Sequence, residues 1–165
     1  HKQMAASDKT LQHETGPRGS FQSPAQEAFA GLLRTASMLR RRFAAILEPH
    51  DLTPSQYNVL RILRGADEPL PTMQIRERLI EETPGVTRLV DHLAEKGLVQ
   101  RERCPDDRRQ VLCKITPAGL RLLEKLDAPV DRFDEESMGV LSPSEQEQLI
   151  ERLDTIRTGL RQGAN

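Results

Sequence analysis

Apolar residues recur at helical spacing along most of this chain, and one stretch of alternating residues interrupts them near the middle. The first apolar stripe predicts a long helix that begins at Ser23-Pro24 and ends near Glu48-Pro49. Its members are Phe29, Leu32, Leu33, Ala36, Leu39, Phe43, Ile46 and Leu47. The sequence Thr53-Pro54-Ser55-Gln56 is a capping box, which predicts a second helix that ends by Gly65.

Two short helices are predicted next, on either side of a turn through residues 81–82. Thr72 is the expected cap of the first, after a short strand at Leu70, and Thr83 is the expected cap of the second. Gly97 is expected to end the second helix. The apolar residues of that helix, which recur at helical spacing, are Val86, Leu89, Val90 and Leu93.

A charged hairpin follows these helices. Residues 99–103 alternate in character, residues 105–109 form a polar turn, and residues 111–115 return as a second strand. Two short helices followed by a β-hairpin make a winged helix-turn-helix. The predicted fold class is therefore mainly α, with a small β-hairpin wing and a helical dimerisation arm.

The rest of the chain predicts two more helices, one opened by Thr116-Pro117 and one by the capping box of residues 142–145. The first contains Pro129, where we expect a kink or a break. Both carry more apolar positions than a small domain can cover, so the first long helix and a second copy of the chain are expected to bury them. The expected organisation is a flexible N-terminal extension (1–23), a first dimerisation helix (24–50), a winged DNA-binding domain (51–116) and C-terminal dimerisation helices (117–165).

Charge and composition narrow the function. The 165 residues carry a formal net charge of −1, and residues 117–165 hold six Lys and Arg against ten Asp and Glu. DNA binding must therefore come from local charge placement. The chain shows no membrane-length apolar run and no signal-like segment, which favours a soluble cytoplasmic protein. It also lacks a Gly-rich phosphate loop, a Cys-x-x-Cys pair and a His cluster, so we expect no enzyme, cofactor or metal site.

The helix that follows Thr83 has a polar face at its amino end. The residues expected there, at positions that enter a major groove, are Thr83, Pro84, Gly85, Thr87, Arg88 and Asp91. Arg88 is placed to bond guanine O6 and N7 or a phosphate, and Thr87 to touch a thymine methyl or a phosphate. The alternative is a polar face that is merely hydrated, which the hairpin that follows disfavours.

The turn of the hairpin carries the second candidate site. The spacing of Asp107 and Arg109 allows the carboxylate to hold the guanidinium extended. Arg109, with Arg108 beside it, is then placed to enter the minor groove, whose negative potential favours arginine. Surface ion pairing without DNA contact is the alternative.

The segments LTPSQYNVLRIL, TPGVTRLVDHLAEKGLV, DDRR and KITPAG lie in this order between Leu52 and Gly119. Together they resemble the MarR family of bacterial transcriptional regulators. The resemblance implies an obligate homodimer, built from the first and last helices, that reads a pseudo-palindromic double-stranded operator. It implies that Arg88 contributes to major-groove binding and Arg109 to minor-groove binding.

The resemblance also implies regulation. Family members commonly lose DNA affinity when a small aromatic or phenolic effector binds, or when a cysteine is oxidised. We therefore expect a sequence-specific regulator that acts as a repressor and is released by a small effector. A redox-responsive regulator and a winged-helix module used only for protein contacts are the alternatives.

Two departures from the family pattern limit the resemblance. His92 stands where many relatives have Arg, and the first long helix lacks the reactive cysteine of the peroxide-sensing branch. Cys104 and Cys113 lie on the two wing strands and are expected either to pair across the hairpin or to be inert thiols. Candidate effector contacts are Met38, His50 and Tyr57, each with core or loop packing as the alternative.

Overall fold

The computed structural model describes Leu11 and residues 21–163. The predicted extension of residues 1–23 therefore lies almost entirely outside the described residues. The chain divides into two compact units, His1–Arg42 and Phe43–Asn165. Helix α2 (Pro24–Leu47) begins and ends where the apolar stripe predicts, and it continues from the first unit into the second.

A short 3-10 helix, η1 (Glu48–His50), leads from α2 into the second unit. Asp51, which follows it, has a left-handed φ of 53°, a conformation that Asp adopts more readily than most residues. The Lys96 ammonium group lies 3.1 Å from the Asp51 carboxylate and also donates to the Asp51 carbonyl. These contacts hold the turn that carries the chain into the next helix.

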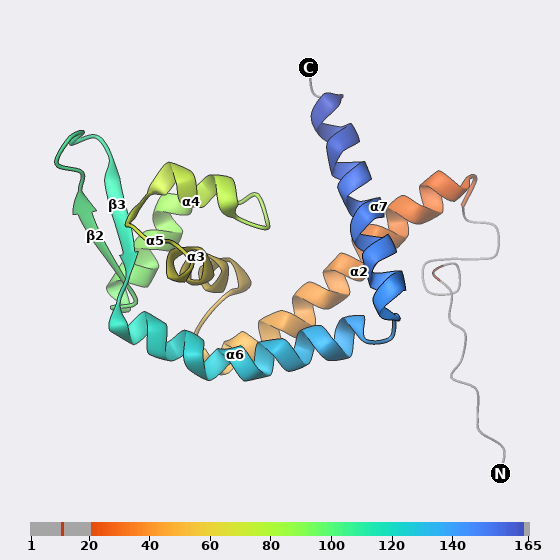
Figure 1. Ribbon diagram of the computed structural model, residues 1–165, viewed down its shortest axis with the longest axis horizontal. Helices are drawn as coiled ribbons and strands as arrows, with labels where there is room; N and C mark the ends of the chain where they lie inside the picture. The colour runs from red at the N-terminus through yellow and green to blue at the C-terminus, as the bar shows by residue number, and fades with distance from the viewer. Residues whose placement is uncertain (1–10, 12–20, 164–165) are drawn as a thin grey trace, which may run out of the picture. The chain divides into compact units, whose positions relative to one another are not determined.

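The second unit contains a winged helix (Figure 1). Its elements are α3 (Pro54–Arg64), β1 (Leu70–Pro71), α4 (Thr72–Arg78), α5 (Val86–Glu95), β2 (Val99–Arg103) and β3 (Val111–Ile115). The three strands form an antiparallel sheet in the order β1-β3-β2. The predicted mainly α fold with a small β-hairpin wing is confirmed, and the expected short strand at Leu70 supplies the third strand.

One apolar cluster holds these elements together. Leu60 of α3, Ile75 of α4 and Leu93 of α5 are completely buried, as are Leu123 and Leu126 of the helix that follows the sheet. The core is aliphatic for the most part, as the low aromatic content of 3% predicts. This packing fixes α5 and the hairpin on one scaffold.

Local capping explains several of the helix ends. The Thr53 hydroxyl accepts from the Gln56 N–H at 3.2 Å, and the Gln56 side chain accepts from the Thr53 N–H at 3.1 Å, so the predicted capping box is confirmed. Gly97, with a left-handed φ of 73°, follows α5 and lets the Leu98 N–H reach the Leu93 carbonyl at 3.0 Å. The predicted end of that helix is therefore also confirmed.

Two predicted caps were wrong. Thr72 is the first residue of α4 rather than its cap, and its hydroxyl lies 3.9 Å from the Cys113 sulfur. The Thr83 hydroxyl donates to the Glu81 carbonyl at 3.2 Å, and α5 begins only at Val86. Gly85, with a left-handed φ of 88°, provides the first helical acceptor for the Leu89 N–H, because the chain turns into the helix there.

The C-terminal part of the second unit consists of α6 (Pro117–Met138) and α7 (Pro143–Gln162). Thr116 caps α6 and Ser142 forms a capping box for α7, both as predicted. The expected break at Pro129 is absent, since α6 runs through it. Proline removes one backbone hydrogen bond there, while Leu126 and Val130 on either side stay buried in the core. None of the helices in the described part of the chain is long and apolar enough to span a membrane.

A bidentate ion pair connects α6 to α3. Both guanidinium nitrogens of Arg64 donate to the Asp127 carboxylate at 2.9 Å. The hydrogen bonds from Arg64 hold the pKa of Asp127 below its ordinary value, and the same bonds raise the pKa of Arg64. The charged form of Asp127 is thus favoured in the folded protein.

We expect Asp127→Asn to lower the free energy of unfolding in a pH-dependent way. Because the folded-state pKa of Asp127 is depressed, its contribution is complete above the unfolded pKa of about 3.9 and is lost as the pH falls through the folded value. Urea unfolding at pH 7 and at acid pH measures the difference in the free energy of unfolding between wild type and variant. This difference should become smaller only below about pH 4. Asp131→Asn, at an exposed position on the same helix, is the control; an equal gap for both variants would contradict the prediction.

Candidate nucleic-acid interface

The amino end of α5 presents a polar face to solvent. Val86 and Val90 are 5% and 2% exposed, and they anchor the helix to the core. Thr87 and Arg88 lie between these anchors in the sequence and are exposed. Among the residues that the structure describes, Arg88 forms no ion pair, so its guanidinium group is available to a base edge or a phosphate.

The residues before α5 form the approach to this face. Pro84 and Gly85 are exposed, whereas Thr83 is half-buried and bonded to the Glu81 carbonyl. Because Gly85 lacks a side chain, it offers no cap, and the first N–H groups of α5 have no side-chain partner at this position. The amino end therefore combines unbonded N–H groups with the adjacent Arg88, an arrangement suited to anions.

Asp91 differs from the other predicted residues of this face. Its carboxylate forms an ion pair with Arg101 of β2. Arg101 was missed as a site residue, although its place in the alternating strand put it on the same side as Val99. The pair joins α5 to β2, and a DNA contact by Asp91 stays a prediction.

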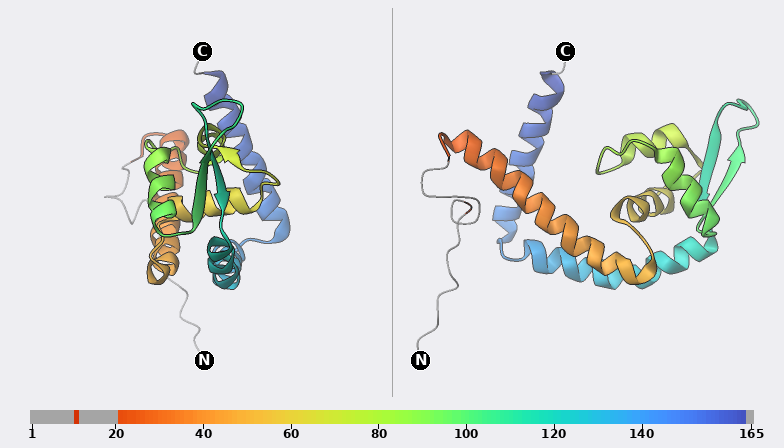
Figure 2. Two further views of the ribbon diagram at one scale, coloured as in Figure 1. Left: turned by 90° about the vertical axis from the view of Figure 1, so that its left-hand side faces the viewer. Right: turned by 180° about the vertical axis from the view of Figure 1, so that it is seen from behind.

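The β2–β3 hairpin projects from the winged helix (Figure 2), and backbone hydrogen bonds close its tip, where the predicted wing residues lie. The Cys104 N–H donates to the Gln110 carbonyl at 3.0 Å, and the Gln110 N–H donates to the Asp107 carbonyl at 2.9 Å. The Asp107 carboxylate accepts from the Arg109 backbone N–H at 3.1 Å and from its Nε at 3.3 Å. The side chain of Arg109 is nevertheless 93% exposed, so its terminal guanidinium nitrogens point away from the turn.

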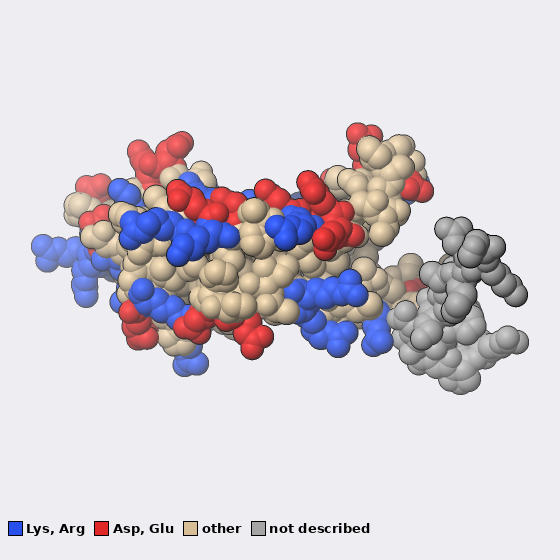
Figure 3. Space-filling view, turned by 90° about the horizontal axis from the view of Figure 1, so that it is seen from below, with Lys and Arg blue, Asp and Glu red and all other residues tan. Residues whose placement is uncertain are grey.

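Charge on the surface is local rather than global. Lys and Arg alternate with Asp and Glu over much of the face in Figure 3, while a group of Lys and Arg stands at the end where Figure 1 shows the hairpin. The exposed basic residues of the hairpin are Arg101, Arg103, Arg108, Arg109 and Lys114. Glu102, Asp106 and Asp107 lie on the same hairpin, so its five basic residues exceed its acidic ones by two, while the whole chain has a net charge of −1.

Of the two alternatives for the cysteines, the structure contradicts pairing across the hairpin. Cys113 pairs in register with Arg101, whereas Cys104 lies opposite Gln110, three residues farther along the strand. That offset is about 10 Å, and a disulfide requires Cα atoms within about 7 Å. Cys113 is also completely buried, and burial raises the pKa of its thiol, which lowers its reactivity.

Thiol labelling should therefore distinguish the two cysteines. We expect iodoacetamide to alkylate the half-buried Cys104 of the native protein and to reach Cys113 only after unfolding in urea. Peptide mass spectrometry before and after unfolding measures both sites. Equal labelling rates in the native protein, or a native disulfide between the two, would contradict this prediction.

The three candidate effector contacts have different surroundings. Met38 lies on the part of α2 in the first unit, and the half-buried His50 ends η1. Tyr57 is 5% exposed, its ring meets that of Phe43 edge-on at 5.3 Å, and its hydroxyl accepts from Arg61 at 3.1 Å. Tyr57 thus contributes to the core, and an effector role for these residues stays a prediction.

The fold and this interface define the class of protein. A helical head with a three-stranded antiparallel sheet, an exposed helix end and an arginine-tipped hairpin is a winged-helix transcription regulator of the DNA-binding type. A sequence model of the MarR family matches residues 50–110. A MarR transcription factor from Planctomyces limnophilus is 38% identical, over 82% of this chain and 98% of that one, with a TM-score of 0.64. The chain belongs to the MarR family.

More distant structures agree with this fold. AbsC, a MarR family transcriptional regulator from Streptomyces coelicolor, is 21% identical over 86% of this chain and 97% of its own, with a TM-score of 0.75. BpsR from Bordetella bronchiseptica, whose DNA binding is regulated by 6-hydroxynicotinic acid, is 22% identical over 79% of this chain and 98% of its own, with a TM-score of 0.71. At these identities the two structures support the fold alone.

Proposed function

We propose that this chain is a homodimeric repressor that binds a pseudo-palindromic DNA operator and leaves it when a small aromatic or phenolic effector binds. The observation that carries the proposal is the pairing of two exposed arginines on one scaffold. Arg88 stands at the amino end of α5, and Arg109 extends from the tip of the adjacent hairpin. A helix end of this kind suits the major groove, and an extended arginine suits the narrower minor groove.

In this proposal α5 recognises the base sequence, and the hairpin fixes the position of the protein along the DNA. Thr87 and Arg88 contact base edges or the phosphates beside them, while Arg108 and Arg109 anchor the hairpin in the neighbouring minor groove. The ion pair between Asp91 and Arg101 supports this division because it joins the two reading elements. His92, which is exposed on α5, would add a phosphate contact through a ring N–H.

Uncovered apolar side chains support a homodimer. On α7, Ile150, Ile156 and Leu160 are 57%, 48% and 69% exposed, and none of the residues of that helix is buried. On α2, the side chains of Phe29, Leu32 and Leu33 are exposed. A second copy of the chain would cover such surfaces, and the resulting two-fold symmetry matches a pseudo-palindromic operator.

Release by an effector would work as a population shift. A ligand that favours a head separation different from one turn of DNA, about 34 Å, lowers operator affinity without touching the DNA. BpsR responds to 6-hydroxynicotinic acid, which supports small aromatic acids as the first class to test.

Binding to genomic DNA fragments tests the proposal. The purified chain should retain a small set of fragments, with affinity that falls steeply as salt rises, by a log-log slope of about −0.9 per neutralised phosphate. Aromatic acids and phenols, beginning with 6-hydroxynicotinic acid, are then screened for release of the retained fragments. Absent or salt-independent binding would overturn the proposal in favour of a protein-interaction module. A reporter gene behind a retained fragment separates repression from activation.

A further inference from the structure

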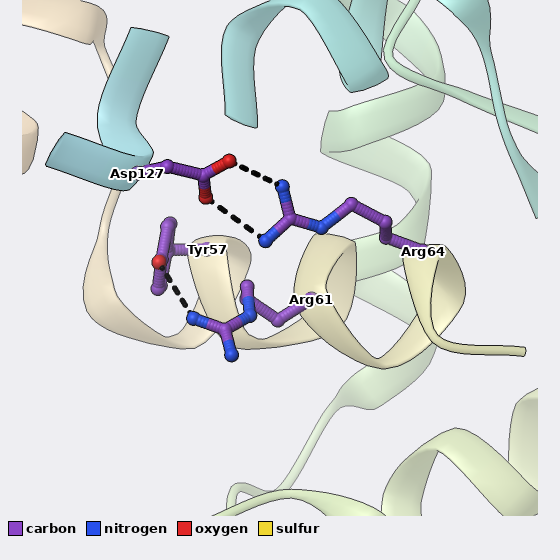
Figure 4. A network of polar contacts seen from close by, with 4 residues as sticks. All are labelled: Tyr57, Arg61, Arg64 and Asp127. Atoms are coloured by element: carbon purple, nitrogen blue, oxygen red, sulfur yellow. Dashed lines mark hydrogen bonds and ion pairs between the residues drawn. The ribbon is translucent and has the colours of Figure 1, made fainter. Parts of the chain in front are cut away.

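A network of polar and aromatic side chains joins α3 to α6 (Figure 4). Arg64, in the last turn of α3, meets Asp127 across a sequence separation of 63 residues, with two parallel bonds of 2.9 Å. One turn earlier, Arg61 donates to the Tyr57 hydroxyl at 3.1 Å and lies 5.9 Å from the centre of its ring. Because Tyr57 engages Arg61, the Asp127 carboxylate is left to Arg64 alone in the network drawn.

The Arg64–Asp127 pair adds a directional contact to the packing between α3 and α6. Leu123 and Leu126 of α6 are completely buried, and apolar burial is itself non-directional. A bidentate pair requires the planes of the guanidinium and carboxylate groups to match, so it fixes the rotation of α3 about α6 as well as their distance. The two side chains are 29% and 40% exposed, so solvent screens the pair only in part.

The position of the pair along α6 gives it a role beyond stability. The winged head, residues 54–115, ends with β3, and Thr116 connects β3 to α6. Asp127 lies at the middle of α6. Two residues later, Pro129 removes a backbone hydrogen bond from the helix. A contact that fixes the head just before this weakened turn determines how the reading residues are oriented relative to the C-terminal helices.

We propose that Arg64 and Asp127 are positioning residues for DNA recognition, which clamp the winged head to α6 and so set the spacing of the two heads in the dimer. This inference rests on the proposed function, since it presupposes a dimer that reads two half-sites. With the clamp closed, an operator of the correct half-site spacing is bound and a lengthened one is rejected. With the clamp open, the heads adapt, so affinity for the correct spacing falls and discrimination is lost.

The test compares two duplexes for each protein variant. One duplex is a genomic fragment retained by the wild-type chain. The other is the same fragment with two base pairs inserted between its half-sites, which lengthens the half-site spacing by about 7 Å. Asp127→Asn and Arg64→Gln should reduce the ratio of the two affinities by about twofold to fivefold, because an ion pair that solvent screens in part contributes up to about 1 kcal/mol. Arg64→Lys, which keeps the charge but loses the two-pronged geometry, should give an intermediate ratio.

Asp131→Asn is the matched control, because it removes the same charge from an exposed position one turn later on α6. A loss of folded protein lowers the apparent affinity for both duplexes equally, so it does not change the ratio. A ratio that stays at the wild-type value in Asp127→Asn and in Arg64→Lys overturns the clamp. Failure of the wild-type chain to bind either duplex in a salt-dependent way overturns instead the proposed function.

Discussion

Arg88→Ala and Arg109→Ala should each weaken binding to a retained genomic duplex, but in different ways. Loss of a bidentate contact to a base costs about 1–3 kcal/mol, so Arg88→Ala should lower affinity about tenfold to a hundredfold and relax the preference at one position of each half-site. Arg109→Ala should weaken binding to all sequences and reduce the salt slope by about one unit, because it removes an exposed charge from the wing.

Fluorescence anisotropy with labelled duplexes over a range of salt concentrations measures both effects. Arg132→Ala is the control, since it removes the same charge from an exposed position on α6. Equal losses in all three variants would indicate a general effect of net charge, and unchanged affinity in Arg88→Ala and Arg109→Ala would remove these arginines from the interface.

The DNA-facing elements were predictable from the sequence where the signal is local. A threonine, a proline and a glutamine within four residues are enough to place the start of α3, and Ser142 places the start of α7 in the same way. The alternation of residues 99–103 likewise gave β2. These features depend on neighbouring residues, so no knowledge of the tertiary structure is needed.

Errors arose where two local signals compete. Thr83-Pro84 and Gly85 are both plausible helix starts, two residues apart, and the structure uses Gly85. Gly85 adopts a left-handed φ of 88°, and Val86, the first residue of α5, is 5% exposed in the core. Only the assembled head contains this information.

Long-range pairs could not be predicted at all. The ion pair of Asp91 with Arg101 was not foreseen because the two residues lie on different elements, which meet through the packing of α5 on β2. The Arg64–Asp127 pair joins residues 63 positions apart. The strand register also determines whether the two cysteines can form a disulfide. Cys113 lies opposite Arg101, three residues before Cys104, so the two sulfurs are too far apart.

Gly119→Ala should destabilise the winged head more than any surface change described above. A Cβ atom at this buried glycine would lie 2.6 Å from the Leu98 carbonyl oxygen and 2.7 Å from Cγ1 of Ile115. The Leu98 carbonyl also accepts a hydrogen bond from the Thr116 N–H at 3.0 Å. Moving this carbonyl away from the added Cβ would stretch that hydrogen bond, which lies between β3 and α6. Overpacking of this kind costs about 1–3 kcal/mol.

Gly159→Ala provides the opposite expectation within the same chain. Gly159 lies inside α7 with no atom within 4 Å of the added Cβ, so alanine should raise stability by about 0.5–1 kcal/mol through helix propensity. Urea unfolding followed by circular dichroism compares the two variants with wild type. If Gly119→Ala unfolds at the wild-type urea concentration, the close approach of α6 to Leu98 is not required, and the anchoring of the wing to α6 must lie in other contacts.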